Sequence, residues 1–582
     1  MNKEADKPLP TSADVVVVGS GAAGLTAAIV AAAAGKNVVL LEKTSLVGGT
    51  SAWSGGVAWV PNNHLMAAAG IDDSPEKARR YIASVLGENI EQEKVDAFLA
   101  NCSAAFEFLD KKTSAARLMS YPGVDYYPDN PSATSHRGVM VPPYDGRELG
   151  AHLAELQLPL PQMAVFGSMQ VDVTDVYHLQ RMLKSWTSLK HSVRLVCRYA
   201  IDRLVWKRGT RLIRGNALAA RLYRSALDLG VTVVRNAPVN ELRRAGKRMA
   251  AVVYTHEGQS VELQVRLGVI LASGGVSASE RYRQMLMPFA KEHVSMLPPG
   301  NSGDGVDMAL AQGGQLGKTH VANGCLTPVS VLKKPDGSVV KYPHLAFDRC
   351  KPGSVMVDGH GLRFTNESAS YHEVGKAMQT CSAVPAYLIA DTSFLRWYGM
   401  GQARPFPYPV KPMVDAGYLV EAATLDELAR KLEIDPQGLA QTVARNNELA
   451  KLGFDPDHGR GGNAYNRSLG DAEHGPNPCL GEILQAPFYA VRLYPGDIGT
   501  LVGLQVNTSA QVLDGQGYPI AGLYACGLDI NSVFSGFYPS AGCTHGPNIT
   551  FAYVAAQHLV AHDPHTPLAQ ETTMHMETGV PA

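Results

Sequence analysis

Residues 535–547 carry side chains suited to acid–base chemistry on a carbonyl compound. They read Ser-Gly-Phe-Tyr-Pro-Ser-Ala-Gly-Cys-Thr-His-Gly-Pro, with Tyr538, Ser540 and Gly542 as the candidate reactive positions. Because Pro539 restricts the backbone, we expect a tight loop that ends at a helix N-terminus near Gly542. The Tyr538 hydroxyl and the Gly542 N–H would then form a pair of donors for a carbonyl oxygen that gains negative charge.

A dinucleotide-binding β-α-β unit at the start of the chain is the first element expected to position this loop. Four valines at 15–18 predict a buried parallel strand, and a G-x-G-x-x-G turn follows at Gly19, Gly21 and Gly24. An Ala-rich helix and a second apolar strand come next, and that strand ends at Glu42. The glycines suit a tight turn, a pyrophosphate against the backbone and close helix packing, and Glu42 suits the adenosine ribose.

Residues 43–56 favour FAD over a nicotinamide dinucleotide. They form a second Gly/Ser-rich loop directly after the acid, and only an extended flavin cofactor needs further small polar partners there. Thr50, Ser51 and Ser54 can donate hydroxyls, while Gly55 and Gly56 let an isoalloxazine ring approach the chain. The alternative is an ordinary surface turn. We expect the FAD to be bound non-covalently.

Two later strand-to-glycine segments, residues 266–275 and 517–527, complete a resemblance to the two-dinucleotide-fold flavoprotein superfamily. The resemblance implies an α/β fold in which a discontinuous Rossmann-like FAD-binding domain is interrupted by an inserted α+β capping (catalytic) domain. The expected boundaries are 1–283 and 486–565 for the FAD-binding domain, with a helical excursion at 121–215, 284–485 for the cap and 566–582 for a mobile tail. The residues expected to contact FAD are Gly19, Gly21, Ala22, Ala23, Gly24, Glu42, Lys43, Gly49, Thr50, Ser51, Ser54, Gly55, Gly56, Val239, Ala272, Ser273, Gly274, Gly527 and Thr544.

Residues 361–371 resemble the R-F-x-N-E element that lies over the flavin in the fumarate reductase branch of this superfamily. In that branch the residue four after the Glu is an Arg, which donates a proton to a dicarboxylate. Here that position, four after Glu367, is Tyr371. Without a fixed cation the site is poorly suited to a dicarboxylate, whereas a phenol suits a neutral, apolar substrate whose proton must be moved.

Both segments are similar to those of the FAD-dependent 3-ketosteroid dehydrogenases, which desaturate the steroid A ring. The similarity covers most of the chain, and residues 130–215 match least. The resemblance implies that Tyr538 and Gly542 polarise the 3-keto oxygen and that Tyr371 is the base at carbon 2. A D-Y-x-P motif at 125–128 makes Tyr126 the candidate to assist that base, with Tyr127 as its competitor.

Ser540 departs from the Δ1-dehydrogenase pattern, which has Gly at this position. A Tyr-x-Ser arrangement resembles the Δ4-(5α)-dehydrogenases, in which the Ser, relayed through the equivalent of Tyr371, removes a proton from carbon 4. On this ground the sequence slightly favours Δ4-(5α) activity, with Δ1 activity as the alternative. In either case Tyr371 or Ser540 needs a lowered pKa or a relay, because an unperturbed phenol has a pKa of about 10.

Two further functions stay open. The same residues would serve a flavin desaturase or reductase of another cyclic ketone, such as a cyclohexanone carboxylate. A flavin-binding protein without this activity, a sensor or an assembly factor, is disfavoured by tyrosines on two separate glycine-rich segments. No haem or iron–sulfur motif is present, so electrons would leave through an external acceptor that is quinone-like or soluble.

Composition narrows the class of protein. The 582 residues suggest two or three domains, and a net charge of -1 argues against nucleic-acid binding. The eight cysteines are scattered without a C-x-x-C pair, so we expect buried thiols, no metal site and a cytoplasmic location. Cys526 and Cys543 are read as packing residues. His545 lies close to the flavin edge in sequence terms and could tune the flavin, but a structural role is favoured.

The stretch from Arg181 to Arg214 stands out by charge, because it holds ten basic residues and a single acid, Asp202. Tryptophans and aliphatic residues are interleaved. One interpretation is a solvated helical excursion of the FAD-binding domain. The other is a contact with a membrane surface or another subunit, with the protein loosely membrane-associated, which would suit a lipophilic substrate.

Overall fold

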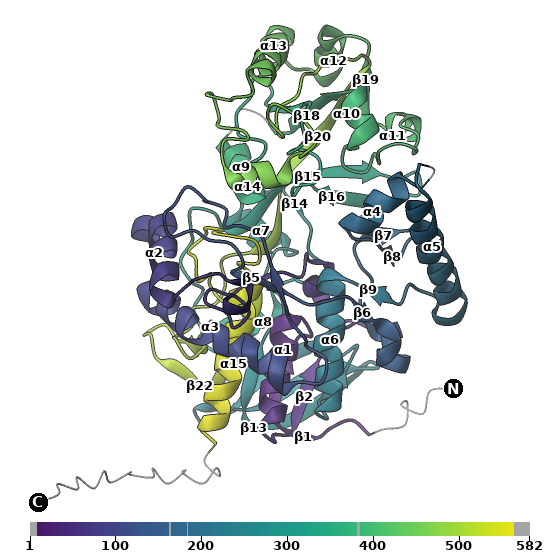
Figure 1. Cartoon of the computed structure of the whole chain (residues 1–582). Helices are drawn as coiled ribbons and strands as arrows, with labels where there is room; N and C mark the ends of the chain where they lie inside the picture. The colour runs from purple at the N-terminus through teal and green to yellow at the C-terminus, as the bar shows by residue number, and fades with distance from the viewer. Residues whose placement is uncertain (1–7, 162–163, 183, 381–383, 564–582) are drawn as a thin grey trace, which may run out of the picture.

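A computed structural model of the chain describes residues 8–161, 164–182, 184–380 and 384–563. The predicted tail at 566–582 and Cys381 lie outside the described residues. The molecule has two main parts, built on an eight-stranded sheet (lower half of Figure 1) and a seven-stranded sheet (upper half).

The larger sheet contains the predicted dinucleotide unit. Its central order is β10-β2-β1-β13-β12-β11, and β22 and β21 extend it from β13. Strand β13 pairs in parallel with both β1 and β22, so the N-terminal and C-terminal segments meet in one sheet. The strands are β1 (Ser12–Val18), β2 (Val38–Leu41), β10 (Thr232–Val234), β11 (Val239–Ala245), β12 (Arg248–His256), β13 (Gln259–Leu271), β21 (Gln511–Leu513) and β22 (Pro519–Ala525).

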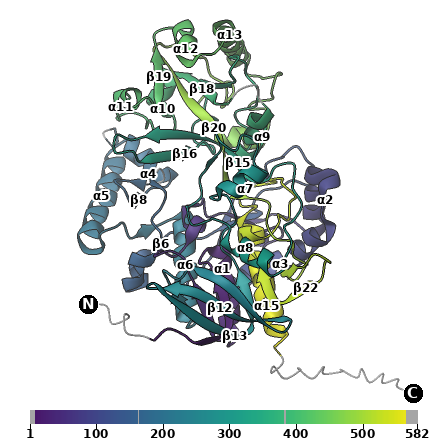
Figure 2. The same cartoon turned by 180° about the vertical axis from the view of Figure 1, so that it is seen from behind.

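Helices cover the larger sheet because its central strands are apolar on both faces. Residues Val15, Val16 and Val17 of β1 are fully buried. Helix α1 (Ala22–Ala33) packs against α15 (His545–Ala561) and α6 (Arg214–Asp228), and α15 packs in turn on α3 (Gln92–Lys112). Figure 2 shows the opposite face, where β12 and β13 lie in front of α1. The first and last helices of the described chain are therefore neighbours.

The smaller sheet has the order β16-β15-β20-β18-β17, with β14 and β19 also paired to β20. Its strands are β14 (Val294–Ser295), β15 (Gly324–Lys333), β16 (Val339–Pro343), β17 (Ser354–Val357), β18 (Ala386–Asp391), β19 (Leu419–Ala422) and β20 (Phe488–Thr500). The helices of this part are α9 (Tyr371–Thr380), α10 (Thr392–Trp397), α11 (Lys411–Asp415), α12 (Leu425–Leu432), α13 (Pro436–Leu452) and α14 (Ala464–Leu469). The mixture of helices and antiparallel strands is the α+β architecture expected for a cap.

The division into domains stays a proposal, and β20 changes one of its boundaries. The FAD-binding domain was predicted to resume at 486, but β20 pairs with four strands of the smaller sheet. A long apolar strand looks the same in sequence whichever sheet it joins. We therefore place the return to the larger sheet after residue 500.

A helical excursion leaves the larger part between β6 (Tyr144–Asp145) and β9 (Arg211–Leu212), which pair with each other. It contains a short hairpin of β7 (Ala164–Val165) and β8 (Met169–Gln170), and two helices, α4 (Val173–Gln180) and α5 (Trp186–Trp206). Figure 1 shows α5 at the outer side of the molecule. Among the described helices, none is both long enough and apolar enough to cross a bilayer.

Candidate active site

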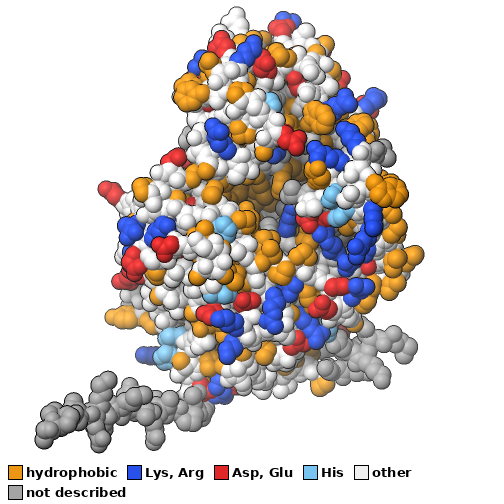
Figure 3. Space-filling model, in the orientation of Figure 1, with side chains coloured by type: hydrophobic (Ala, Val, Ile, Leu, Met, Phe, Trp, Pro, Cys, Tyr) orange, Lys and Arg blue, Asp and Glu red, His pale blue; other side chains and the backbone are white. Residues whose placement is uncertain are grey.

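A cavity of about 610 Å³ runs between the two main parts. One end is formed by the Gly19 turn and Glu42, and the other by Tyr126, Tyr371 and Tyr538. Figure 3 shows the molecule hollowed at this level, with hydrophobic side chains around the opening. All residues predicted to contact FAD line this cavity except Gly24.

The glycine turn has the geometry that a bound pyrophosphate requires. Gly19 has a φ of +104°, and a Cβ on Gly24 would stand 1.9 Å from the Gly19 carbonyl oxygen. Gly24 therefore lies in the contact between helix and strand and not in the cavity wall, which explains its absence from the lining. The N-terminus of α1 points its free N–H groups toward the space beside Gly21.

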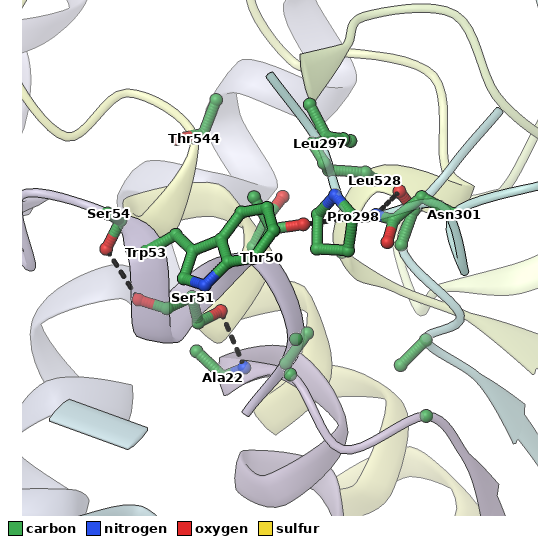
Figure 4. Close-up of a pocket in the computed structure, with 18 of the residues that line it drawn as sticks. Ala22, Thr50, Ser51, Trp53, Ser54, Leu297, Pro298, Asn301, Leu528 and Thr544 are labelled. Atoms are coloured by element: carbon green, nitrogen blue, oxygen red, sulfur yellow. Dashed lines mark hydrogen bonds between the residues drawn. The ribbon is translucent and has the colours of Figure 1, made fainter. Parts of the chain in front are cut away.

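Polar side chains brace the two Gly-rich loops against each other. The Glu42 carboxylate accepts hydrogen bonds from the Ser20 N–H (3.1 Å) and the Thr44 N–H (2.8 Å). The Ala22 N–H donates to Ser51 Oγ over 2.9 Å, and Asn301 donates to Thr50 Oγ1 over 3.1 Å (Figure 4). These bonds hold the predicted hydroxyls at the wall, where a ligand would meet them.

Two further observations fit an extended dinucleotide. No atom lies within 4 Å of the position that a Cβ on Gly55 would take, so this backbone faces open cavity. Ser54 Oγ donates to the Ser51 carbonyl (2.8 Å) and accepts from His545 Nε2 (2.9 Å), which leaves His545 Nδ1 as a buried acceptor with no partner among the described residues. Burial lowers the pKa of His545 to about 4, so the ring is neutral at pH 7. His545 thus lies in the cavity wall, where the tuning role left open by the sequence stays a prediction.

Three phenols meet at the far end of the cavity. The ring centroids of Tyr371 and Tyr538 lie 5.5 Å apart, and Tyr126 lies 6.0 Å from each of them. The Tyr371 hydroxyl is hydrogen-bonded to Tyr126, and the Tyr538 hydroxyl contacts Tyr371. Residues separated by more than 400 positions thus lie in one cluster, and Tyr126 lies beside Tyr371, the residue that it was predicted to assist.

Burial controls the acidity of these phenols. Desolvation is the largest effect on Tyr126, Tyr371 and Tyr538, and it raises the pKa of each well above the ordinary value of 10. Tyr371 is therefore a protonated phenol at pH 7. Because its pKa is not lowered, any role as a base depends on the relay through Tyr126.

A buried ionic cluster fixes Tyr371 at the start of α9. Arg363 pairs with Glu367 (2.7 Å) and Asp455 (2.8 Å), and Arg460 also pairs with Glu367 (3.1 Å). The Glu367 carboxylate accepts from the Met356 N–H as well. The R-F-x-N-E element therefore acts as a scaffold in this chain, and its charges pair with one another inside the cap.

The loop of Tyr538 is held by the D-Y-x-P segment at 125–128 and by α2 (Pro75–Leu86). The Pro539 carbonyl accepts from the Tyr126 N–H (3.0 Å) and from the Tyr81 hydroxyl (2.7 Å). Gly542 has a φ of +87°, and a Cβ there would stand 2.7 Å from the main chain of β3 (Ala58–Trp59). Among the described residues, the Gly542 N–H donates to no protein acceptor, so it remains available beside the phenols.

Ser540 does not face the cavity. Its side chain is buried, it is absent from the lining, and its hydroxyl bonds to the Asp125 carboxylate. Asp125 also accepts from Trp59 Nε1 (2.9 Å) and Arg137 Nη1 (2.8 Å), and desolvation raises its pKa despite these partners. The predicted catalytic position of Ser540 therefore has no support, because the turn after Pro539 directs its side chain inward.

The choice between the two tyrosines of the D-Y-x-P motif follows from their directions. Tyr126 lines the cavity, whereas the Tyr127 hydroxyl donates to Glu373 over 2.9 Å. Tyr126 thus holds the position from which Tyr371 can be assisted.

Sequence reasoning missed two residues of this site. The ring of Tyr465 lies 4.6 Å from that of Tyr126 and extends the phenol cluster into the cap. His372 Nδ1 accepts from the Leu326 N–H (3.2 Å), so its Nε2 donates to the Gly536 carbonyl (3.0 Å) and ties α9 to the Tyr538 loop. Tyr465 carries no motif that could have identified it, but the position of His372 directly after Tyr371 was a usable signal.

Comparison with known proteins agrees with this geometry. The FAD binding domain family matches residues 14–544. The 4-oxocyclohex-2-ene-1-carboxylate 5-dehydrogenase of Sinomonas cyclohexanicum is 36% identical over 554 residues, covering 94% of this chain and 93% of that protein. The 3-oxosteroid 1-dehydrogenase of Mycobacterium tuberculosis is 33% identical over 572 residues, covering 94% and 98%.

A solved structure is also similar over nearly the whole chain. It is the 3-ketosteroid Δ1-dehydrogenase of Sterolibacterium denitrificans in complex with 1,4-androstadiene-3,17-dione, with a TM-score of 0.86 and 33% identity over 95% of this chain and 100% of that one. The predicted cofactor and fold are thereby confirmed. The chain belongs to the FAD binding domain family and is an FAD-dependent oxidoreductase.

Proposed function

We propose that the chain desaturates the A ring of a 3-ketosteroid between carbons 1 and 2. The observation that carries this proposal is the orientation of the site: Tyr126, Tyr371, Tyr538 and Gly542 line one end of the cavity, while Ser540 points away from it. A base at carbon 4 would require Ser540 in the lining. The Δ4-(5α) preference drawn from the sequence therefore gives way to the Δ1 alternative, which the steroid-converting relatives also support.

The chain's own residues supply the proton chemistry. The Tyr538 hydroxyl and the Gly542 N–H donate to the 3-keto oxygen and stabilise the negative charge that develops on it. This acidifies the hydrogen on carbon 2. Tyr371 Oη accepts that proton as its own phenolic proton passes to Tyr126, and Tyr126 releases its hydroxyl proton to water. Bound FAD supplies the hydride acceptor for the hydrogen on carbon 1. One proton and one hydride leave, and the carbon 1–carbon 2 double bond forms.

The cavity suits an apolar ligand. Besides the phenols, its described lining includes Leu160, Leu297, Pro343, Leu345 and Ile498. Lys43 is the only Lys or Arg among the described lining residues, and its ammonium is paired with Asp304 over 2.6 Å. A fused-ring ketone without charge would bury its whole surface there.

A smaller cyclic ketone is the second candidate, favoured by the 36% identity to the Sinomonas enzyme. Its carboxylate would need a cation, and no unpaired Lys or Arg lines the described wall. For this reason we rank it below a steroid.

We also propose a cytoplasmic location, in keeping with the free cysteines, and an external electron acceptor that is quinone-like or soluble.

Anaerobic loss of the oxidised-flavin absorbance tests the proposal, with the product identified in each case. We expect a 4-ene-3-ketosteroid to bleach the flavin and to yield the 1,4-diene. A saturated 5α-3-ketosteroid should yield the 1-ene. Formation of the 4-ene would restore the Δ4-(5α) assignment, and bleaching by 4-oxocyclohexanecarboxylate alone would replace the steroid.

A further inference from the structure

Helix α5 buries a polar face and exposes an apolar one, whereas the amphipathic helices of most proteins bury their apolar face. The side chains that it buries against the protein are mostly polar: Ser188, Ser192, Tyr199 and Asp202. Asp202 accepts from the Thr210 N–H (2.9 Å) and hydroxyl (2.8 Å), so the only acid of the helix is turned inward. Because α5 turns these polar side chains toward the protein, its apolar side chains lie on the opposite, exposed face.

The opposite face presents large apolar side chains to the surroundings. Trp186 is 79% exposed, Ile201 62% and Leu204 85%. Val193 and Cys197 are also exposed and fall on the same stripe, because the intervals of seven, four, four and three residues each return to one side of an α-helix. These five residues form what we call the α5 outer face. Figure 3 shows hydrophobic side chains along this edge of the molecule.

Cations flank the α5 outer face without acids of the same helix beside them. Lys190, Arg194, Arg203 and Lys207 lie on or next to it, and none of the four forms an ion pair with a described carboxylate. Apolar groups flanked by Lys and Arg, with a Trp near one end, are the pattern of a helix that lies in the headgroup region of an anionic bilayer.

The charges also argue against a second copy as the partner. A two-fold-related α5 packed antiparallel would bring Lys190 of one copy near Arg203 of the other, and like charges would meet across the contact. The same excursion contributes Gln157 and Leu160 to the cavity wall, so α5 and part of that wall belong to one segment of the chain.

We propose that the α5 outer face binds the surface of an anionic lipid bilayer, with Trp186, Ile201 and Leu204 inserted among the headgroups and acyl boundary. No described helix spans a bilayer, so the attachment is peripheral. This inference does not depend on the identity of the ketone.

Flotation of the full-length FAD-loaded protein with vesicles tests the proposal. We expect flotation with equimolar phosphatidylcholine and phosphatidylglycerol, and much less with phosphatidylcholine alone or in high salt. Lys190→Gln with Arg194→Gln should weaken partitioning by about 25-fold, since one cation near the surface contributes about fivefold. Ile201→Asp with Leu204→Asp should abolish it.

A matched control separates this face from general surface effects. Leu452, at the end of α13, is 69% exposed and far from α5 in the fold, so Leu452→Asp should float like the unchanged protein. All variants should keep their FAD content and their rate of flavin reduction by substrate. An environment-sensitive fluorophore on Cys197 should shift to the blue with anionic vesicles, and the Cys197→Ser protein labelled in parallel should not show the shift.

The proposal is overturned if the protein floats with neither vesicle, or if Leu452→Asp loses binding as much as the α5 pair does. It is also overturned if the chain forms dimers that Leu204→Asp dissociates while vesicles leave the Cys197 fluorophore unchanged, because a second copy would then cover the face.

Discussion

Ser540→Ala separates the two regiochemistries, because the hydroxyl points to Asp125 and not to the cavity. In the structure the Asp125 carboxylate accepts from Ser540, Trp59 Nε1, Arg137 Nη1 and the Thr134 N–H. The substitution removes one of these four donors and leaves a void the size of one oxygen atom. It alters none of the groups that line the cavity.

The hydrogen bonds around Asp125 set the expected effects of Ser540→Ala on stability and on the rate of flavin reduction. A hydrogen bond to a charged group contributes about 1.5–3 kcal/mol, and since three donors remain we expect the free energy of unfolding to fall by about 2 kcal/mol. The rate of flavin reduction should change by less than about threefold. Loss of a general base costs about 10²–10⁴ in rate, so the two cases lie far apart.

The assay is single-turnover flavin reduction under anaerobic conditions, followed by stopped-flow absorbance, together with urea unfolding of the same preparations. Tyr538→Phe serves as the positive control, because it removes a donor to the 3-keto oxygen and should slow reduction about 10²–10³-fold. If Ser540→Ala slows reduction a hundredfold at unchanged stability, Ser540 acts on the substrate and the Δ1 argument is wrong.

The other predictions concern residues on either side of the phenol cluster. Tyr126→Phe should slow flavin reduction about 10–100-fold by removing the relay, whereas Tyr127→Phe, whose hydroxyl bonds to Glu373, should leave the rate unchanged in the same stopped-flow assay. Gly542→Ala should yield little folded holoprotein, because the new Cβ would stand 2.7 Å from the main chain of β3 and the φ of +87° disfavours any side chain. Gel filtration and flavin absorbance measure this yield. A normal yield and a normal rate of flavin reduction would contradict the geometry. Burial lowers the pKa of His372 and His545 to about 4, below the value of about 6.5 in the unfolded chain. The free energy of unfolding that this difference contributes is fully present above pH 6.5. It is lost as the pH falls toward 4, by up to about 3 kcal/mol for each histidine. Urea unfolding at pH 7 and pH 4.5 measures this loss, and His372→Gln should reduce it; an unchanged pH profile in the variant would refute the assignment.

The sequence predicted correctly those parts of the fold whose residues lie close together along the chain. The Gly19 turn, α1 and the acid at Glu42 form a single continuous unit, so spacing alone could place them. The direction of Ser540 depends on Asp125, more than 400 residues earlier, and no pattern within the loop contains that partner. Tyr465 joined the cluster for the same reason without any signal of its own.

Helix α5 shows the same limit in another form. Its helical character and its charge could be read from the sequence, but not which side of it would be buried. The periodicity of apolar residues defines a stripe along the helix, and this stripe is normally assumed to face the protein interior. In α5 the assumption is wrong, because the hydrogen bonds from Thr210 to Asp202 turn the polar side inward.

The meeting of both ends of the chain in the larger sheet has a consequence for biosynthesis. Strand β22 completes the sheet beside β13, and α15 packs on α1, so the Rossmann-like part that emerges first from the ribosome stays unfinished until residues 519–561 have been made. Until then the edge of β13 and the apolar side of α1 are uncovered, which gives chaperones a long period in which to bind the nascent chain. A chain that stops before residue 538 would have a nearly whole cap but neither the Tyr538 loop nor α15, so the apolar side of α1 would stay uncovered.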